Sequence, residues 1–190
     1  MARGQYIAFL NHDDLYFQDH IETSLDEIRT TEADLIFSTA AIVQPSRPES
    51  RERDDWDVRI TAATPAGAYE PYVFSPASTW LMRRDLADQI GPWCTASETW
   101  WMPSQEFLFR AWQSGEKLRA IKKVTVLALH SGRRPGAYKR RDFEENAYFG
   151  ARMASDQRLR EILLSCAAAT MAREQRLKEV TFSPMEFLLR

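Results

Sequence analysis

The sequence is poor in cysteine, with only Cys94 and Cys166 among its 190 residues. Two cysteines this far apart fit no metal-ligand spacing and form no disulfide framework, so we expect a reduced chain without disulfides. A long apolar run is also missing near the N-terminus, where Tyr6–Leu10 is too short for a signal-peptide core or a membrane span. We therefore expect a cytoplasmic protein without a transmembrane segment.

The chain also lacks an excess of charge of either sign, with 25 Lys and Arg against 27 Asp and Glu. This balance gives no indication of nucleic acid or of an anionic membrane surface as a partner. Apolar residues are plentiful, because 44% of the sequence is hydrophobic and 12% is aromatic. We predict a globular protein of about one domain with a sizeable core.

The first ordered region has the pattern of a strand, a helix and a second strand. Tyr6–Leu10 is a short, unbroken apolar run, typical of a strand buried on both faces of a parallel sheet. Apolar residues recur with helical spacing over 21–28, and residues 34–43 form the second strand. In such a βαβ unit the carboxyl ends of the strands meet at the ligand-binding edge of the sheet. We therefore expect residues 11–14 at that edge.

The remaining elements are predicted from shorter signals. Gln44–Gly67 has prolines and mixed charges without periodicity, which indicates an exposed loop. Next come a helix over Arg84–Ile90, a helix over Gln105–Ser114 with Ser104 as its N-cap, a strand over Val124–Leu129, and helices from Arg141 onward. In the last region we expect two apolar stripes, one of Phe143, Ala147, Ala151 and Ala154 and one of Leu159, Ile162, Leu163 and Cys166.

Residues 11–14 combine an amide, an imidazole and two adjacent carboxylates directly after the first strand. Asp13 and Asp14 offer hard oxygen ligands for Mg²⁺ or Mn²⁺, through which a diphosphate could be held. The alternative is a capped turn, since Asp and Asn commonly close strand-to-helix loops. These residues by themselves leave both interpretations open.

Glu106 stands in the first turn of the helix predicted after Ser104, where the helix dipole favours an anion. A carboxylate held there could accept a proton from a hydroxyl substrate. The alternative is an ion pair with Arg110 on a solvated face, which would contribute about 0.3–0.5 kcal/mol. Considered by itself, the position of Glu106 favours the ion pair.

Weaker candidates lie elsewhere in the chain. His130 ends the strand predicted over Val124–Leu129 and could be a metal ligand, although a single histidine is more often structural. The arginines after it, which include Arg133 and Arg134, could clamp a phosphate. Trp100 and Trp101 could stack on sugar rings, and the alternative for each is packing in the core.

Two stretches of the sequence resemble one known family. GQYIAFLNHDDLYFQDHIETSL, residues 4–25, looks like the middle of a family-2 glycosyltransferase of the GT-A fold, where a buried strand leads to Asp-x-Asp-Asp and then a helix. SQEFLFRAWQSGEKLRAI, residues 104–121, is similar to the acidic pair that opens a later helix in that family. The resemblance implies a partial α/β GT-A domain over residues 1–141, a Rossmann-like mixed sheet flanked by helices, with a helical extension over 142–190.

The resemblance also implies roles for individual residues. Asp13 matches the acid that binds the metal, and Asn11 stands where the motif usually has its first Asp. Glu106 matches the general base, and Gln105 stands where a second acid is more common. His130 lies where the family often has a histidine near the metal.

The reaction implied is an inverting transfer from a nucleotide-sugar donor to a hydroxyl group of a carbohydrate or lipid-linked acceptor. Glu106 would deprotonate that hydroxyl, while Mn²⁺ or Mg²⁺ would stabilise the departing diphosphate. Arg133 and Arg134 fall in a segment that resembles one closing over the donor. We assign the acceptor to Trp100 and Trp101.

The sequence also departs from the family pattern. It begins just before the Asp-x-Asp strand, so the family's opening strands, which hold the nucleotide base, are not part of it. The strand over Tyr6–Leu10 would then leave a long apolar edge unpaired, and we expect a homo-oligomer formed through that edge. The neutral Asn11 and Gln105 favour a second hypothesis, a catalytically inactive truncated homologue that acts in binding or assembly.

Overall fold

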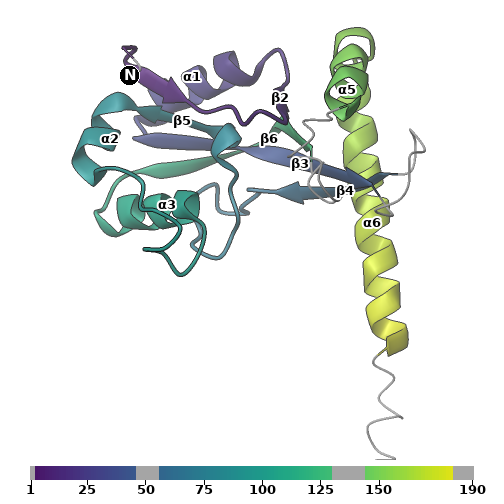
Figure 1. Cartoon of the computed structure of the whole chain (residues 1–190). Helices are drawn as coiled ribbons and strands as arrows, with labels where there is room; N and C mark the ends of the chain where they lie inside the picture. The colour runs from purple at the N-terminus through teal and green to yellow at the C-terminus, as the bar shows by residue number, and fades with distance from the viewer. Residues whose placement is uncertain (1–2, 46–55, 130–143, 182–190) are drawn as a thin grey trace, which may run out of the picture.

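The computed structural model describes residues 3–45, 56–129 and 144–181, which form a six-stranded mixed sheet with helices on both faces (Figure 1). The strands are β1 (Tyr6–Ala8), β2 (Asp14–Tyr16), β3 (Leu35–Pro45), β4 (Trp56–Thr61), β5 (Trp80–Arg83) and β6 (Leu118–Leu129). The helices are α1 (His20–Thr31), α2 (Arg84–Ile90), α3 (Pro103–Gln113), α5 (Glu144–Ser155) and α6 (Leu159–Thr181), with a 3₁₀ helix η1 (Ala77–Thr79) before β5. This architecture confirms the predicted α/β fold class.

β3 is the central strand of the sheet. On one side it runs parallel to β6, and on the other side it pairs antiparallel with β5 through its first residues and with β4 through its last. The order of strands is β1-β5-β3-β6-β2, with β4 beside β3. Residues 35–43 are mostly apolar, and buried throughout apart from the half-buried Ile42, as expected for a strand covered on both faces.

The first strand differs from the prediction made for Tyr6–Leu10. β1 spans only Tyr6–Ala8 and is partly exposed, because it lies at the end of the strand order and, among the strands that the structure describes, β5 is its one neighbour. The predicted long edge is therefore three residues long. β1 and β3 still run in the same direction, since each is antiparallel to β5.

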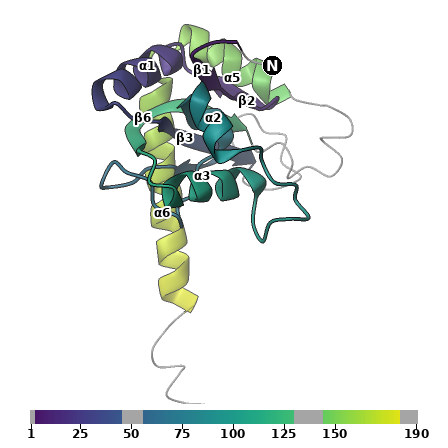
Figure 2. The same cartoon turned by 90° about the vertical axis from the view of Figure 1, so that its left-hand side faces the viewer.

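α1 and α3 cover opposite faces of the sheet (Figures 1 and 2). α1 packs Ile28 against Ile36 of β3 and Leu81 of β5. On the other face, Phe107 of α3 joins a cluster with Phe37 of β3. Successive residues of a strand point to opposite faces, so Ile36 and Phe37 contribute to two different layers of the core.

α5 and α6 complete a further apolar cluster with β3, β4 and β6. The prediction for α5 was wrong, because Ala147, Ala151 and Ala154 are exposed and the helix packs through Phe149, whose ring lies 5.4 Å from that of Trp56. An alanine methyl group offers little area to bury, and the aromatic ring decides which face turns inward. Phe143 lies outside the described residues.

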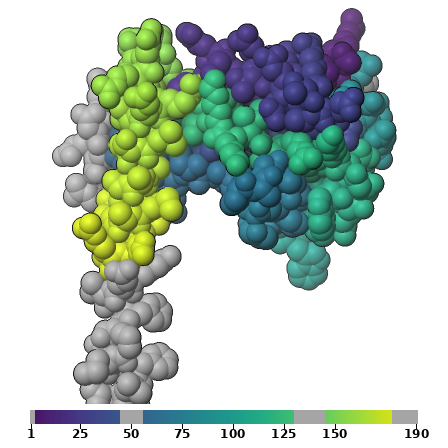
Figure 3. All heavy atoms as spheres, turned by 180° about the vertical axis from the view of Figure 1, so that it is seen from behind, coloured from purple at the N-terminus to yellow at the C-terminus, as the bar shows by residue number. Residues whose placement is uncertain are grey.

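The buried stripe of α6 agrees with the prediction at Leu159 and Leu163 and then continues through Ala167 and Thr170. The predicted Ile162 and Cys166 are exposed instead. Ion pairs from this helix to Asp57 and Arg59 of β4 hold it along the sheet. Seen from behind, the last turns of α6 stand clear of the rest of the fold (Figure 3).

Two other predictions need correction. The loop predicted over Gln44–Gly67 contains β4, which pairs with β3 along its whole length, and residues 46–55 lie outside the described part. The N-cap of α3 is Met102, followed by Pro103 at the first helical position, so Ser104 lies within the first turn. Within the described residues, no helix is both long and apolar enough to cross a membrane.

Candidate functional site

Asp13 and Asp14 lie where the chain enters β2. Residues 9–13 carry the chain from β1 to β2, which stand at opposite ends of the strand order. The Asp14 amide donates to the Asn11 carbonyl oxygen at 3.2 Å, which closes a turn, and Asp14 then pairs with Ala128 of β6. Each aspartate is only 7% exposed. The sequence therefore forms the capped turn that was one of the two interpretations left open, and it also buries two adjacent carboxylates in that turn.

Ser78, in η1, fixes this turn. Its Oγ donates to Asp14 Oδ2 at 2.5 Å and accepts the Asn11 amide at 3.0 Å, while the Asn11 side chain donates to the same Asp14 oxygen at 2.9 Å. Burial raises the pKa of Asp14, and the hydrogen bonds from Ser78 and Asn11 partly oppose that effect. Asp14 Oδ2 therefore accepts hydrogen bonds that stabilise the turn.

Residues 75–80, which we call the linking segment, join this turn to α3. The Gln105 side chain forms two hydrogen bonds with the Ser75 backbone, from Ser75 N at 3.1 Å and to Ser75 O at 2.8 Å. Ser75 Oγ accepts a hydrogen bond from the Trp80 indole at 3.0 Å. Ser75, Trp80 and Gln105 are all buried. The two stretches that carry the family resemblance are therefore connected through buried hydrogen bonds.

Sequence reasoning missed the linking segment. Ser75, Ser78 and Thr79 are fully buried, although such residues are mostly exposed in globular proteins. The signal available in the sequence was a cluster of three hydroxyl residues directly before the apolar strand β5. Its partners are distant along the chain, 64 residues for the contact with Asp14, so no local pattern identifies them.

Glu106 lies in the first turn of α3, as predicted, and forms the alternative contact considered for it. Its Oε1 accepts a hydrogen bond from Arg110 Nε at 2.6 Å. Arg110 is in turn held by the carbonyl oxygen of Pro92 at 2.8 Å and by that of Ile90. Within the described part of the chain, Glu106 Oε2 is buried. Arg110 therefore orients the carboxylate through Oε1, and the Cys94 thiol interacts with the same carboxylate.

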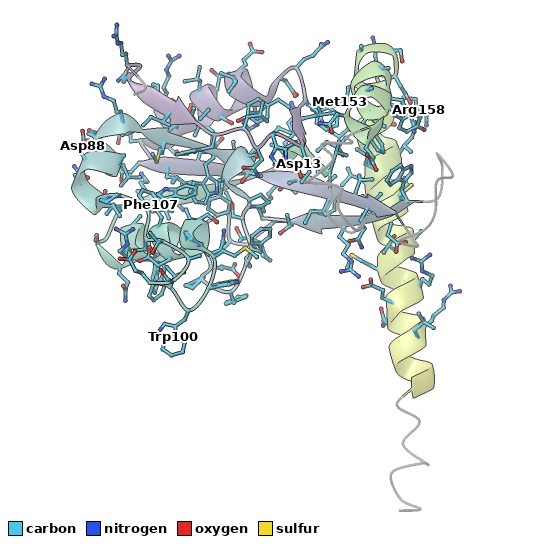
Figure 4. The ribbon with its side chains drawn as sticks, viewed as in Figure 1. Asp13, Asp88, Trp100, Phe107, Met153 and Arg158 are labelled. Carbon is cyan, nitrogen blue, oxygen red and sulfur yellow. The ribbon has the colours of Figure 1, made fainter. Side chains whose placement is uncertain are left out.

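The tryptophans divide into two groups. Trp80 and Trp93 belong to an aromatic cluster with Phe107, with ring centroids about 6 Å apart in each pair. Trp100 is fully exposed and Trp101 is 49% exposed, so core packing does not account for these two. Figure 4 shows Trp100 at the tip of the loop before α3, well apart from Asp13. The structure thus leaves Trp100 outside the immediate surroundings of the aspartates.

The described residues contain part of a metal site at most. They bring together no group of three or more His, Cys, Asp or Glu side chains suited to a metal ion. His130, Arg133 and Arg134 lie outside the described residues. Because Asp14 Oδ2 is taken by Ser78 and Asn11, Asp13 is the better candidate ligand in the turn. This fits the common mode of Mg²⁺ binding, in which one or two carboxylates act together with substrate phosphates.

Comparison with known proteins finds one family model that matches part of the chain. The model of Glycosyl transferase family 2 matches residues 1–91. Residues 1–91, slightly less than half of the chain, are thus similar to glycosyl transferase family 2. The matched segment includes Asp13 and Ser78, whereas Glu106 lies beyond it. No curated protein sequence matches the chain significantly.

Proposed function

We propose that this family 2 glycosyltransferase domain transfers a sugar, with inversion, from a nucleotide-sugar to a hydroxyl group of a carbohydrate or lipid-linked acceptor. The observation that carries the proposal is the linking segment, which hydrogen-bonds at Ser78 to the aspartate turn and at Ser75 to Gln105, next to Glu106. We take residues 1–141 as the transferase part and 142–190 as its extension.

In the proposed reaction, the Glu106 carboxylate takes the proton of the acceptor hydroxyl as the hydroxyl oxygen attacks the anomeric carbon. The bond from that carbon to the diphosphate breaks, and the diphosphate leaves with the electron pair. Arg110 keeps the Glu106 carboxylate in place through Oε1. General-base catalysis of this kind contributes about 10²–10⁴-fold to the rate.

Asp13 is the proposed ligand of Mn²⁺ or Mg²⁺, with His130 as a second ligand. A bound divalent ion would offset the negative charge that develops on the leaving diphosphate. Arg133 and Arg134 are proposed to contact the donor phosphates, because arginine matches phosphate geometry with paired hydrogen bonds. Trp100 and Trp101 are proposed to meet the acceptor, since their exposed indole rings can stack on sugar faces.

Calorimetry with Mn²⁺ and a panel of nucleotide-sugars tests the metal and donor assignments. We expect heat of donor binding that requires Mn²⁺ and is lost in Asp13→Asn. His12→Gln is the matched control, because its side chain is adjacent and 60% exposed. Absence of heat from every donor, with a folded chain by circular dichroism, would contradict the proposal.

The general-base role has a kinetic test. Glu106→Gln keeps the size of the side chain and removes its basicity, so we expect turnover to fall about 10²-fold or more with little change in donor affinity. A loss of equal size in turnover and in donor affinity would exclude this role for Glu106.

A second candidate, an inactive homologue that acts in assembly, is favoured by the exposed edge of β1. Arg84 N donates to Gln5 O, and residues 5 and 7 therefore face β5, which leaves the backbone groups of Tyr6 and Ala8 facing outward. Such an edge can pair with a strand of another chain. Sedimentation should show a dimer that Ala8→Pro weakens, and a monomer at high concentration would count against this candidate.

A further inference from the structure

A hollow of about 470 Å³ lies beside the aspartate turn. One wall is the chain from Leu15 to Asp19, directly after Asp14, and the other is α5 with the turn that leads into α6. Phe17 and Met153 supply apolar surface, and Gln18 and Gln157 lie among the polar lining residues. Its size falls within the range of small-molecule sites in proteins, about 300–1,000 Å³.

Gly150 keeps the α5 wall of this hollow open. A Cβ atom at this position would meet nothing within 4 Å, so close packing does not require a glycine here. Glycine within a helix is also less favourable than alanine by about 1 kcal/mol. Gly150 therefore leaves space in the α5 wall that close packing does not require.

The charged side chains that line the hollow, Asp19, Asp156 and Arg160, all take part in ion pairs. Asp19 accepts hydrogen bonds from Arg160 at 2.7 Å and from Lys123 at 2.6 Å, and Arg160 Nε also donates to Val124 O. Burial opposes ionisation of Asp19, but the hydrogen bond from Lys123 and the charge of Arg160 outweigh it and lower its pKa. Arg160 is therefore already engaged by Asp19 and by the Val124 carbonyl oxygen, and Asp156 adds a second carboxylate to the lining, which disfavours a phosphate.

Neutral polar groups remain for a ligand. The amides of Gln18 and Gln157 are exposed and make no hydrogen bond within the described part of the chain. An amide both donates and accepts, which suits hydroxyl groups. The Arg160 guanidinium lies over the Phe17 ring at 4.5 Å, so Met153 and the part of Phe17 that Arg160 leaves uncovered offer apolar surface to a sugar ring. Together these groups match a neutral polyhydroxylated molecule better than an anion.

We propose that this hollow binds a sugar ring of a neutral carbohydrate, at a place separate from the acceptor position proposed at Trp100 and Trp101. Carbohydrate binding here does not depend on the transfer activity proposed above. α5 packs against β2, which begins at Asp14, and Figure 4 shows Met153 on the side of the fold where Asp13 lies. The helices beyond the family match thereby contribute to carbohydrate recognition.

Saturation-transfer NMR on the full chain tests this proposal. The probes are the methyl glycosides of glucose, galactose, mannose and N-acetylglucosamine. We expect transfer to at least one glycoside, lost in Gly150→Leu, which fills the hollow and favours the helix. Ala151→Leu is the matched control, because Ala151 is exposed on the same helix and does not line the hollow, and it should bind as the unmodified chain does.

Three results would overturn the proposal: no glycoside binds to the folded chain, binding persists in Gly150→Leu, or uridine diphosphate gives the signal that Gly150→Leu removes. A change of Gln157 to Ala should weaken glycoside binding several-fold without changing the thermal unfolding of the chain. None of these measurements requires a metal, a donor or turnover. A failure here therefore leaves the tests of Asp13 and Glu106 unaffected, and the reverse also holds.

Discussion

Acid should destabilise this fold through His20, the first residue of α1. His20 is fully buried, and its Nδ1 lies 2.8 Å from Thr125 Oγ1, which itself donates to Ser38 Oγ. Since a threonine hydroxyl has one proton, His20 Nδ1 must be the donor in this contact. His20 Nε2 then carries the lone pair, and within the described residues it has no partner. Protonation would place a charge on that buried nitrogen.

The size of the effect follows from the pKa. Burial lowers the pKa of His20 to about 4 from 6.5, and the nearby Asp19 partly opposes this. Between these values the unfolded chain binds a proton that the folded chain does not, so stability falls as the pH falls from about 6.5 to about 4. At about 1.4 kcal/mol for each pH unit, the loss amounts to roughly 3 kcal/mol. Above about pH 6.5 both states are neutral at this position and the contribution is constant.

Urea unfolding followed by tryptophan fluorescence at a series of pH values measures this loss. His20→Asn is the comparison, since its amide can still donate to Thr125 and does not titrate. The variant should be less stable at neutral pH, because the imidazole ring packs 3.9 Å from that of Tyr16. Its stability should nevertheless depend less on pH, by the amount given above. Equal pH dependence in both proteins would refute the assignment of the titration to His20.

Three further substitutions test the site. Ser78→Ala removes a donor from the buried Asp14 carboxylate and should cost about 2–3 kcal/mol of unfolding free energy, measured in urea. In Gln105→Glu, the ionised carboxylate cannot donate to Ser75 O, so we expect a similar loss of unfolding free energy at neutral pH. Protonation of the carboxylate in acid should restore part of this stability. Equal losses at neutral and acid pH would contradict this explanation. Trp100→Ala should change stability by less than about 0.5 kcal/mol and lower kcat/KM for acceptors; unchanged kinetics would remove Trp100 from the acceptor site.

The sequence was sufficient where structure follows from a local pattern. α1 and α2 were predicted from periodicity and from the glycine after α2, and β3 from its apolar run. β2 and β4 were missed because their pairing with β6 and β3, rather than their own residues, makes them strands.

In the candidate site, too, local features could be predicted from the sequence and long-range contacts could not. The aspartate turn could be predicted from consecutive residues, and so could the place of Glu106 in a first helical turn. The linking segment could not, because the hydrogen bond from the Asn11 amide to Ser78 spans 67 residues and a serine has no directional pattern of its own. Long-range pairing of small polar groups is decided only when the surrounding core is assembled.

Because β6 lies beyond residue 91, the segment that matches the family model is shorter than the segment that the sheet needs in order to fold. Residues 1–91 carry the family match, yet among the described strands β6 is the one neighbour of β2, and β3 runs beside β6 along most of its length. A fragment cut at residue 91 would leave β2 without a partner and one side of β3 open to water or to other chains. Residues 1–91, which the family model matches, should therefore be unable to fold without β6, which lies beyond that match.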